Sequence, residues 1–181
     1  MTVEDIYLKG CFIITLPIFK DERGYFTESF NKYNFEKLTG IHTNFVQDNL
    51  SKSSKGVLRG LHFQTGKNAQ AKLVQVIKGK VLDVCVDIRD ESPTYGQYFS
   101  IILDDIKKKQ LYVPRGFAHG FLVLEDDTIF SYKCDNYYNK EAERGIIYND
   151  EILSINWNYP EDELIISSKD MQLPAFKNVF K

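Results

Sequence analysis

Alternating apolar and polar residues in the middle of the chain predict β-strands. The clearest run is Val81–Ile88, where every second residue is a large aliphatic and Asp83 and Asp87 lie between them. A period of two sends one set of side chains to a packed layer and the other set to a more polar face. Leu73–Ile77 is a similar run, and Lys78–Lys80, with its central glycine, predicts a tight hairpin turn joining the two strands.

Further short strands and turns follow at even spacing, whereas helical periodicity is confined to a short stretch near Asn34–Leu38. This pattern favours an all-β sandwich or barrel. Among such folds we expect a jelly roll with short peripheral helices. Burying unpaired polar groups costs free energy, so the polar residues on the inward faces are expected to line a ligand pocket. The remaining predicted strands are Ser100–Leu103, Gln110–Val113, Gly120–Leu124 and Ile129–Lys133, and the turns are Glu91–Gly96, Asp104–Lys108 and Glu125–Asp127.

Length and charge narrow the class of protein. A chain of 181 residues that is 43% hydrophobic and 27% charged fits one domain, spanning residues 1–181, with a real core. No window approaches the ~18 consecutive apolar residues that a membrane span requires. The net charge of −2, from 23 basic and 25 acidic residues, argues against a general nucleic-acid binder. It leaves room for a small basic pocket that binds one phosphorylated ligand.

The cysteines and the N-terminal apolar run point to a cytoplasmic protein. The three cysteines are far apart and form no Cys-x-x-Cys motif, which argues against a disulfide framework or a thiolate zinc site. The run Cys11–Phe19 follows Glu4 and Asp5 instead of a basic segment and contains Pro17, unlike a signal peptide. We therefore expect this run to form a strand.

Two of the three histidines, His62 and His119, lie in similar sequence motifs and are candidate catalytic or binding residues. His42 lies in no such motif and is expected at the surface. His119 follows the turn Pro114-Arg115-Gly116, and His62 lies within the run Gly56–Gln64. Strict alternation along that run predicts two faces, one with Leu58, Gly60 and His62 and the other with Arg59 and Leu61.

The spacing of these histidines matches the frame of metal-binding cupins, Gly-x5-His-x-His followed by Pro-x-Gly-x2-His, but the ligands are incomplete. Gln64 stands where the second histidine is expected, and Lys72 follows where a glutamate is expected. Two imidazoles beside an ammonium make a poor site for a divalent cation. The chain also lacks Gly-x-Gly-x-x-Gly after a strand. We expect neither a metal nor any other cofactor.

Without a metal, the polar residues suit acid–base chemistry. His62 can take a proton near pH 7 if a carboxylate holds its other ring nitrogen, and Asp170 and Asp83 are both candidates for that partner. Tyr132 can donate a phenolic proton, and Lys72 can stabilise a developing oxyanion. The guanidinium groups of Arg23 and Arg59 suit the oxygens of a diphosphate.

A series of short motifs extends in fixed order from about Gly10 to Pro174. It comprises Asp21-x-Arg23-Gly24-x-Phe26-x-Glu28, Gly56–Gln64, Gln70-x-Lys72-Leu73-Val74, Ser92-Pro93-Thr94-x-Gly96, Pro114–Phe121, Tyr132-Lys133 and Ser168-Lys169-Asp170. In this order the motifs resemble the dTDP-4-dehydrorhamnose 3,5-epimerase family, the metal-independent cupins of dTDP-L-rhamnose synthesis.

The resemblance implies a cupin-type jelly roll, or double-stranded β-helix, and roles for four residues. His62 would be the general base that removes protons from C3 and C5 of dTDP-4-dehydro-6-deoxy-D-glucose, with Asp170 as its carboxylate partner. Tyr132 would be the general acid on the opposite face of the sugar. Lys72 would face the C4 oxygen and stabilise the enolate.

The resemblance also implies a set of substrate contacts and a homodimer. Tyr138 resembles the aromatic residue that stacks on thymine, although the adjacent Tyr137 keeps that choice open. Arg23 and Glu28 would reach the neighbouring subunit's site through an exchanged N-terminal segment, and no nucleic acid or membrane is implied as a partner. The remaining residues implied to contact the nucleotide, diphosphate or sugar are Gln47, Asn49, Arg59, His119, Glu143 and Lys169.

Other functions share much of this pattern. A single-centre 3-epimerase and a 3,4-ketoisomerase act on the same kind of dTDP-4-keto-6-deoxy sugar. A cupin that binds sugar nucleotides without turning them over belongs to a different class, and a metal-dependent oxygenase is the remaining alternative. The residue pattern alone leaves the order of inversion at C3 and C5 open.

Overall fold

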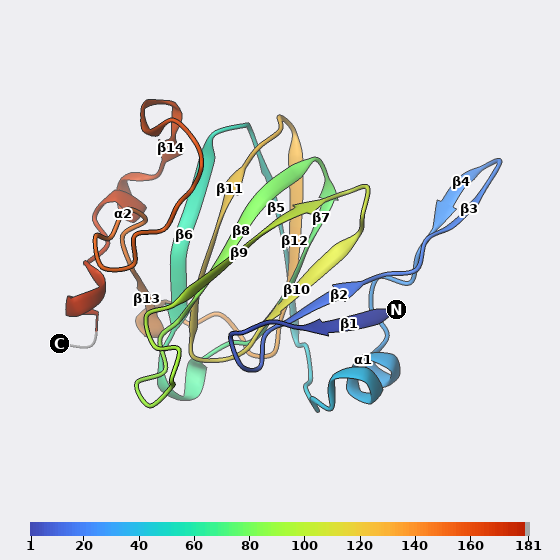
Figure 1. Cartoon of the computed structure of the whole chain (residues 1–181), viewed down its shortest axis with the longest axis horizontal. Coiled ribbons are helices and arrows are strands. Elements are labelled where there is room, and N and C mark those ends of the chain that lie inside the picture. The colour runs from blue at the N-terminus through green and yellow to red at the C-terminus, as the bar shows by residue number, and fades with distance from the viewer. Residues whose placement is uncertain (180–181) are drawn as a thin grey trace.

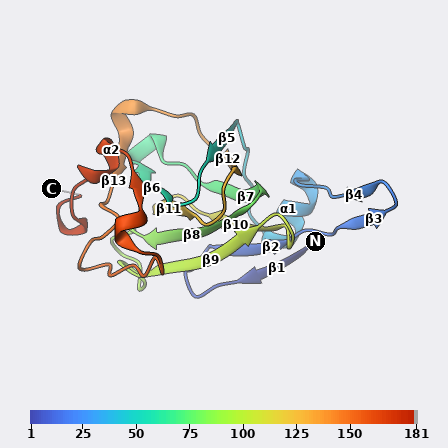
Figure 2. The same cartoon turned by 90° about the horizontal axis from the view of Figure 1, so that it is seen from above.

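The computed structural model describes residues 1–179, which form two facing β-sheets with short helices at the periphery (Figure 1, Figure 2). The last two residues of the expected domain 1–181, Phe180 and Lys181, lie outside the described residues. One sheet has the order β1-β2-β10-β7-β12-β5, and the other has the order β13-β6-β11-β8-β9 with β14 beside β6.

The first sheet and the small hairpin contain β1 (Thr2–Asp5), β2 (Phe12–Thr15), β3 (Phe19–Asp21), β4 (Gly24–Phe26), β5 (Gln47–Ser53), β7 (Lys72–Lys78), β10 (Lys109–Val113) and β12 (Thr128–Cys134). The second sheet contains β6 (Val57–Gln64), β8 (Lys80–Asp87), β9 (Tyr98–Asp104), β11 (Phe117–Val123), β13 (Glu143–Gly145) and β14 (Ile165–Ile166). The α-helices are α1 (Lys32–Thr39) and α2 (Ser168–Met171), with short 3-10 turns at Gly66–Asn68, Lys140–Ala142, Glu161–Glu163 and Phe176–Asn178. The strands predicted from alternation are confirmed, and the chain forms a jelly roll.

The predicted hairpin between Leu73–Ile77 and Val81–Ile88 is wrong. Both runs are strands, but β7 pairs with β10 and β12, whereas β8 pairs with β9 and β11. The chain crosses from one sheet to the other at Gly79, where φ is +85° and an added Cβ would lie 2.3 Å from Thr128 Oγ1. Alternation identifies a strand but not its partner, so a short glycine turn fits either a hairpin or a crossing.

Both faces of β8 are buried, against different neighbours. Leu82 and Val84 pack outward, in a cluster that includes Trp157 of the C-terminal segment. Val81 and Cys85 point between the two sheets, in the central cluster. The face of β8 that alternation predicts to be more polar is therefore the face that borders the space between the sheets.

Helix α1 covers the outer face of the first sheet. The predicted helical stretch Asn34–Leu38 is confirmed and extends to Lys32–Thr39, with Asn31 as the N-cap and Gly40 as the C-cap at φ +70°. Phe35 is the helix residue that enters the apolar cluster on this face. The helix thus seals the sheet on the side away from the cavity between the sheets.

The apolar run Cys11–Phe19 contains the expected strand, β2, and ends at the first residue of a second strand, β3. Strand β2 ends at Thr15, before Pro17, and β3 starts at Phe19. Proline has no backbone N–H for a strand ladder, so it separates the two strands. Strands β3 and β4 form a hairpin that projects from the body of the molecule (Figure 1), and all their residues are exposed.

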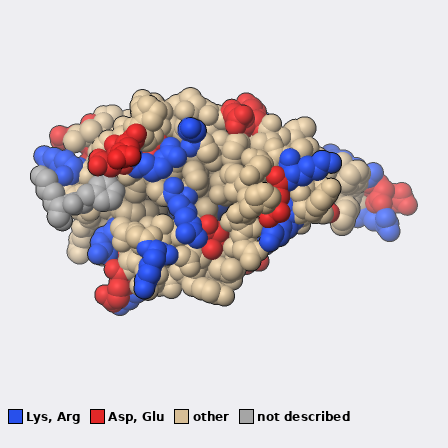
Figure 3. Space-filling model, turned by 90° about the horizontal axis from the view of Figure 1, so that it is seen from below, with Lys and Arg blue, Asp and Glu red and all other residues tan. Residues whose placement is uncertain are grey.

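Basic and acidic side chains are intermixed on the face shown in Figure 3, including the tip of the projecting hairpin. This distribution agrees with the small net charge of −2. Within residues 1–179, no helix is long and apolar enough to cross a membrane.

A buried carboxylate organises the loop that follows β8. Asp87 accepts hydrogen bonds of 2.6 Å each from Arg89 Nη2, Ser92 Oγ and Thr94 Oγ1. Burial alone would raise the pKa of Asp87, but these hydrogen bonds outweigh it and lower the pKa from 3.8 to about 2. The carboxylate therefore stabilises the fold only while it is ionised.

We expect Asp87→Asn to lower the free energy of unfolding at neutral pH by about 1–3 kcal/mol, because hydrogen-bonding groups are left unpaired. A depressed pKa in the folded state contributes stability that is full above the unfolded pKa and is lost as pH falls toward 2. The acid limb of the stability curve should therefore flatten below pH 4. Thermal melts from pH 7 to pH 2 measure both effects, with the exposed Asp90→Asn as control. A variant with an unchanged acid limb would contradict this prediction.

Candidate active site

A cavity of about 630 Å³ lies between the two sheets, beside α2. A neighbouring recess of about 250 Å³ shares Asn49, His62, Lys72 and Tyr132 with it. The residues singled out from the sequence that line one or both spaces are Gln47, Asn49, Arg59, His62, Lys72, His119, Tyr132, Tyr138, Glu143, Lys169 and Asp170. Residues from seven strands or helices far apart in the sequence thus converge on one site.

Strand β6 brings Arg59 and His62 to the same cavity, which corrects the prediction that they lie on opposite faces. In the pairing of β6 with β11, His62 lies opposite His119 and Arg59 lies opposite Phe121. Two residues of β6 therefore face the single residue Gly120 of β11. Such a bulge re-aims the side chains that follow it, so strict alternation fails here.

The bulge requires a close approach of two backbones. Gly60 has a φ of +122°, and an added Cβ would lie 2.6 Å from Gly120 Cα. Leu58 and Leu61, which alternation places on opposite faces, instead share the apolar cluster on the outer side of the sheet. Glycine at both positions thus allows the polar residues of β6 to face inward and the leucines to face outward.

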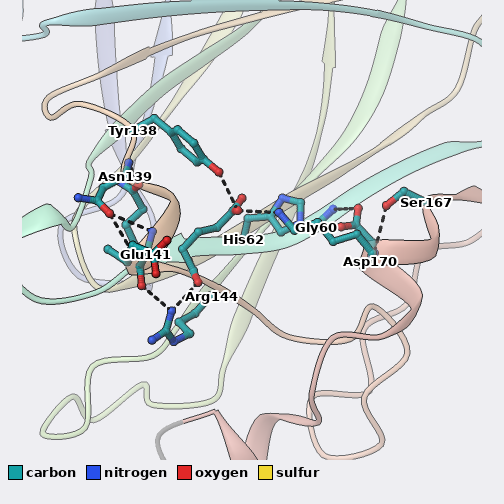
Figure 4. A network of polar contacts seen from close by, with 12 residues as sticks. Gly60, His62, Tyr138, Asn139, Glu141, Arg144, Ser167 and Asp170 are labelled. Carbon is teal, nitrogen blue, oxygen red and sulfur yellow. Dashed lines mark hydrogen bonds and ion pairs between the residues drawn. The ribbon is translucent and has the colours of Figure 1, made fainter.

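Asp170 holds the ring of His62. His62 Nε2 lies 2.8 Å from Asp170 Oδ1, and the Gly60 N–H donates to Asp170 Oδ2 at 3.3 Å (Figure 4). The hydroxyl of Ser167 accepts the Asp170 N–H at 3.0 Å and caps α2. Burial would raise the pKa of Asp170, but the hydrogen bond and charge of His62, with the Gly60 N–H, keep it below its ordinary value. The carboxylate therefore stays ionised beside the ring.

Asp83, the other candidate partner for His62, pairs with His119 instead. Both carboxylate oxygens of Asp83 lie 3.0 Å from His119 Nε2, and both residues are buried. Each of the two cavity histidines thus has its own carboxylate. The third histidine, His42, is exposed as predicted, with its ring 3.4 Å from Glu36.

Lys72 and Tyr132 lie side by side on the wall opposite β6. Lys72 Nζ is 5.9 Å from the centre of the Tyr132 ring. Burial raises the pKa of Tyr132 and lowers the pKa of Lys72. Because the phenol stays protonated at neutral pH, it can donate a proton or a hydrogen bond to a molecule in the cavity.

Glu143 links the loop after β12 to α2. Its Oε2 accepts hydrogen bonds from Tyr138 Oη at 3.0 Å and from Lys169 Nζ at 2.6 Å. Burial would raise the pKa of Glu143, but these two hydrogen bonds lower it. Tyr138 lines the recess, whereas Tyr137 is 66% exposed and outside both spaces. The ring of Tyr138 is thus the one available to a ligand in the recess.

Strand β5 supplies amide groups to the same recess. Gln47 Nε2 donates to Asn49 Oδ1 at 3.0 Å, and Gln47 Oε1 accepts the Tyr138 N–H at 2.9 Å. These contacts fix the Gln47 side chain and the start of the Tyr138 loop relative to each other. Ser51, which we did not single out from the sequence, also lines the cavity. The alternation of polar residues along β5 is a signal that could have identified it.

Arg23 and Glu28 lie apart from the cavity of their own chain. Arg23 is on the tip of the projecting hairpin, where its side chain is 83% exposed and pairs with Asp21. The Glu28 carboxylate accepts hydrogen bonds of 3.1 Å from Asn31 and Asn34 at the start of α1. These two predicted site residues are therefore not brought together with the other eleven within one chain.

The position that carries the second histidine in metal-binding cupins has a structural role here. The Gln64 amide nitrogen donates to the carbonyl groups of Asn68 and Tyr137, and its oxygen accepts the Asn139 N–H. Gln64 thus ties loops together at the edge of the site. Among residues 1–179, no three His, Cys, Asp or Glu side chains are grouped so that they could hold a metal ion.

Comparison with known proteins identifies the family to which this chain is similar. The family model described as dTDP-4-dehydrorhamnose 3,5-epimerase matches residues 5–178. The enzyme of that name from Shigella flexneri is 51% identical, over 97% of this chain and 96% of its own. The crystal structure of the Elizabethkingia anophelis enzyme superposes with a TM-score of 0.94 at 55% identity, covering 98% of this chain and 97% of that one.

One of the similar crystal structures contains a bound ligand. The structure of dTDP-6-deoxy-D-glucose-3,5-epimerase from Legionella pneumophila with dTDP-4-keto-L-rhamnose has a TM-score of 0.95 and 45% identity, covering 98% of this chain and 94% of that one. The expected cupin jelly roll is confirmed. Because sequence and fold agree over nearly the whole chain, this protein belongs to the dTDP-4-dehydrorhamnose 3,5-epimerase family.

Proposed function

We propose that this chain epimerises dTDP-4-dehydro-6-deoxy-D-glucose at C3 and C5 to give dTDP-4-dehydro-L-rhamnose, within dTDP-L-rhamnose biosynthesis. The observation that carries the proposal is the His62–Asp170 pair, which faces the same cavity as Tyr132 and Lys72. The Legionella relative that binds dTDP-4-keto-L-rhamnose supports the class of ligand.

The reaction needs acid–base groups and a stabilised enolate. Protons on carbons that flank a ketone are acidic because the carbanion delocalises onto the carbonyl oxygen. Removing the proton from one face and returning one to the other inverts the carbon without a net change in oxidation state. A base, an acid and a group that stabilises the oxyanion are therefore sufficient.

His62 serves as the general base in this proposal. When Nε2 donates its proton to Asp170, the basic lone pair lies on Nδ1, and the carboxylate stabilises the imidazolium that forms. This arrangement keeps one tautomer and one ring orientation through the cycle. A positioned base of this kind typically contributes about 10²–10⁴-fold to a rate.

Tyr132 and Lys72 complete the proposed chemistry. The raised pKa of Tyr132 keeps its phenol protonated until the enolate takes the proton. Lys72, beside the phenol, faces the C4 oxygen and stabilises the charge that develops there. We assign the remaining cavity residues to the substrate: Arg59 and Lys169 to the diphosphate, Tyr138 and Gln47 to the base, and Asn49, His119 and Glu143 to the sugar and nucleotide.

We also infer a homodimer in which the N-terminal segments are exchanged. The projecting hairpin exposes Phe19 and Phe26 by 61% and 68%, an apolar surface that suits burial against a second copy. Arg23 and Glu28, which lie outside the cavity of their own chain, would then enter the partner's cavity. The three free cysteines fit a reducing compartment, and we place the reaction in the cytoplasm.

His62→Ala should nearly abolish solvent deuterium exchange at both C3 and C5, because no other base holds that position. Proton NMR of dTDP-4-keto-6-deoxyglucose in heavy water measures the exchange, and exposed His42→Ala is the matched control. Exchange at an unchanged rate would remove His62 from the role of base.

The same experiment on the unaltered protein tests the proposed function. Deuterium at C3 and C5 supports it. Deuterium at C3 alone would indicate a single-centre epimerase, a shifted carbonyl would indicate a 3,4-ketoisomerase, and tight binding without exchange would indicate a non-catalytic sugar-nucleotide-binding protein.

Tyr132→Phe should separate proton removal from inversion. The ring remains in the cavity and only the acidic hydroxyl is lost, so exchange on the His62 face should continue while inverted product falls by about 10²-fold or more. Product analysis by proton NMR measures the two processes together. Full formation of inverted product by this variant would show that another group supplies the proton.

Mixing two inactive variants tests the exchanged segment. Arg23→Ala and His62→Ala each damage every site of their own homodimer, but a mixed dimer with exchange has one intact site and one doubly damaged site. After random reassociation, about a quarter of all sites should be active, since half of the dimers are mixed. Activity that stays at the level of the separate variants would mean that Arg23 does not act on a partner's site.

A further inference from the structure

Tyr138, which we assign to the base of the nucleotide, lies in a segment without regular secondary structure. Residues 135–139 connect β12 to the 3-10 turn Lys140–Ala142 and belong to neither. Tyr138 itself is 53% exposed. A residue that is exposed to this extent gains little from apolar burial, so its position depends on hydrogen bonds.

The side chain of Gln64 is hydrogen-bonded to the backbone on both sides of Tyr138. Gln64 Nε2 donates to the Tyr137 carbonyl at 3.2 Å, and Gln64 Oε1 accepts the Asn139 N–H at 2.6 Å. The same Nε2 donates to the Asn68 carbonyl at 2.8 Å. Gln64 is only 7% exposed, so water competes little for these hydrogen bonds. One buried amide thus holds the two residues that flank Tyr138.

The chemistry of these partners requires an amide at position 64. Two backbone carbonyl groups accept and one backbone N–H donates, so the side chain has to supply two donors and one acceptor. An ionised glutamate only accepts, and a neutral histidine has one donor and one acceptor. The glutamine side chain satisfies all three partners at once.

The other contacts of Tyr138 come from the strands next to Gln64 and from β5. In the pairing of β6 with β13, Gln64 lies opposite Glu143, whose Oε2 accepts from Tyr138 Oη at 3.0 Å. Gln47 Oε1 accepts the Tyr138 N–H at 2.9 Å. The hydroxyl, the N–H and both flanking residues of Tyr138 are therefore attached to strands, and the ring lines the recess.

We propose that Gln64 is a positioning residue that holds Tyr138 against the base of the bound nucleotide. This inference rests on the proposed function, since it needs a nucleotide whose base lies in the recess. The amide of Gln64 is engaged by the backbone, so Gln64 acts through Tyr138. His62 precedes Gln64 by two residues on β6. One strand would thus position both the proposed general base and the residue that contacts the nucleobase.

Gln64→Met removes the donors and the acceptor and leaves a side chain of similar length. Calorimetric titration should show dTDP bound about tenfold more weakly, because an aromatic ring that is no longer held stacks less well on the base. Pyrophosphate, which lacks a base, should bind as tightly as to the unaltered protein. In turnover, KM should rise by a similar factor while kcat is unchanged, because contacts to the base are the same in the ground and transition states.

A double variant tests whether Gln64 acts through Tyr138. Tyr138→Ala alone should weaken dTDP binding about tenfold. Adding Gln64→Met to Tyr138→Ala should cause no further loss, because the residue that Gln64 positions is already absent. Two independent residues would instead give the product of both losses, about a hundredfold.

Gln75→Met is the matched control. Gln75 on β7 accepts a hydrogen bond from Gln110 Nε2 at 2.9 Å and lines neither the cavity nor the recess. This variant also loses a hydrogen-bonded amide, but it should bind dTDP normally. If circular dichroism shows that Gln64→Met does not fold, Gln64→Glu takes its place, because glutamate keeps the acceptor for the Asn139 N–H and loses both donors.

Four results would overturn the role of Gln64. They are unchanged dTDP affinity in the folded Gln64 variant, equal weakening for dTDP and pyrophosphate, normal dTDP binding by Tyr138→Ala, and independent losses in the double variant. Failure of the unaltered protein to bind dTDP would instead overturn the proposed function, and the role of Gln64 with it. The two failures are therefore distinguished by the protein in which they occur.

Discussion

The contact between Asp170 and His62 joins two parts of the chain that are 108 residues apart in sequence. Strand β6 carries the ring, and the first turn of α2 carries the carboxylate, which also accepts the Gly60 N–H from β6. One ionised group thus fixes the C-terminal helix against the sheet and sets the tautomer of the histidine. Because Asp170 is only 4% exposed, the ring and the Gly60 N–H must supply the interactions that water would otherwise provide. The site and the end of the fold are therefore stabilised by the same interaction.

The position of His62 depends in turn on the backbone contact between β6 and β11. Gly60 and Gly120 approach so closely that any side chain at either residue would meet backbone atoms of the other strand within 3 Å. This packing allows the bulge, and the bulge puts Arg59 and His62 on one face. The guanidinium of Arg59 and the imidazole of His62 thus face one cavity although they are three residues apart on one strand. Regular pleating would have pointed one of them into the apolar cluster behind the sheet.

The sequence predicts the features of this protein that depend on nearby residues, and it fails where a contact between distant strands decides the structure. Period-two alternation gives the strands correctly because it is a local property of each run. It could not assign β7 and β8 to different sheets, since the turn at Gly79 satisfies a hairpin and a crossing equally. It also failed at Gly60, where the face of each residue depends on Gly120, sixty residues away in sequence. The resemblance to the family named eleven residues that the structure brings together around the cavity and its recess.

The charges around Lys72 show why a buried ammonium suits the proposed enolate. Burial raises the pKa of the neighbouring Cys134 thiol to about 11, so this thiol is neutral at pH 7 and does not offset the lysine charge. Asp83 is hydrogen-bonded to His119, and Glu143 is paired with Lys169, so the nearest carboxylates have partners other than Lys72. Burial lowers the pKa of Lys72, because an ammonium group removed from water is destabilised. Among residues 1–179, no carboxylate forms an ion pair with Lys72, and an oxyanion formed at C4 would supply the missing negative charge. Such a group binds the enolate more tightly than the ketone, and that difference is what lowers the barrier to proton removal.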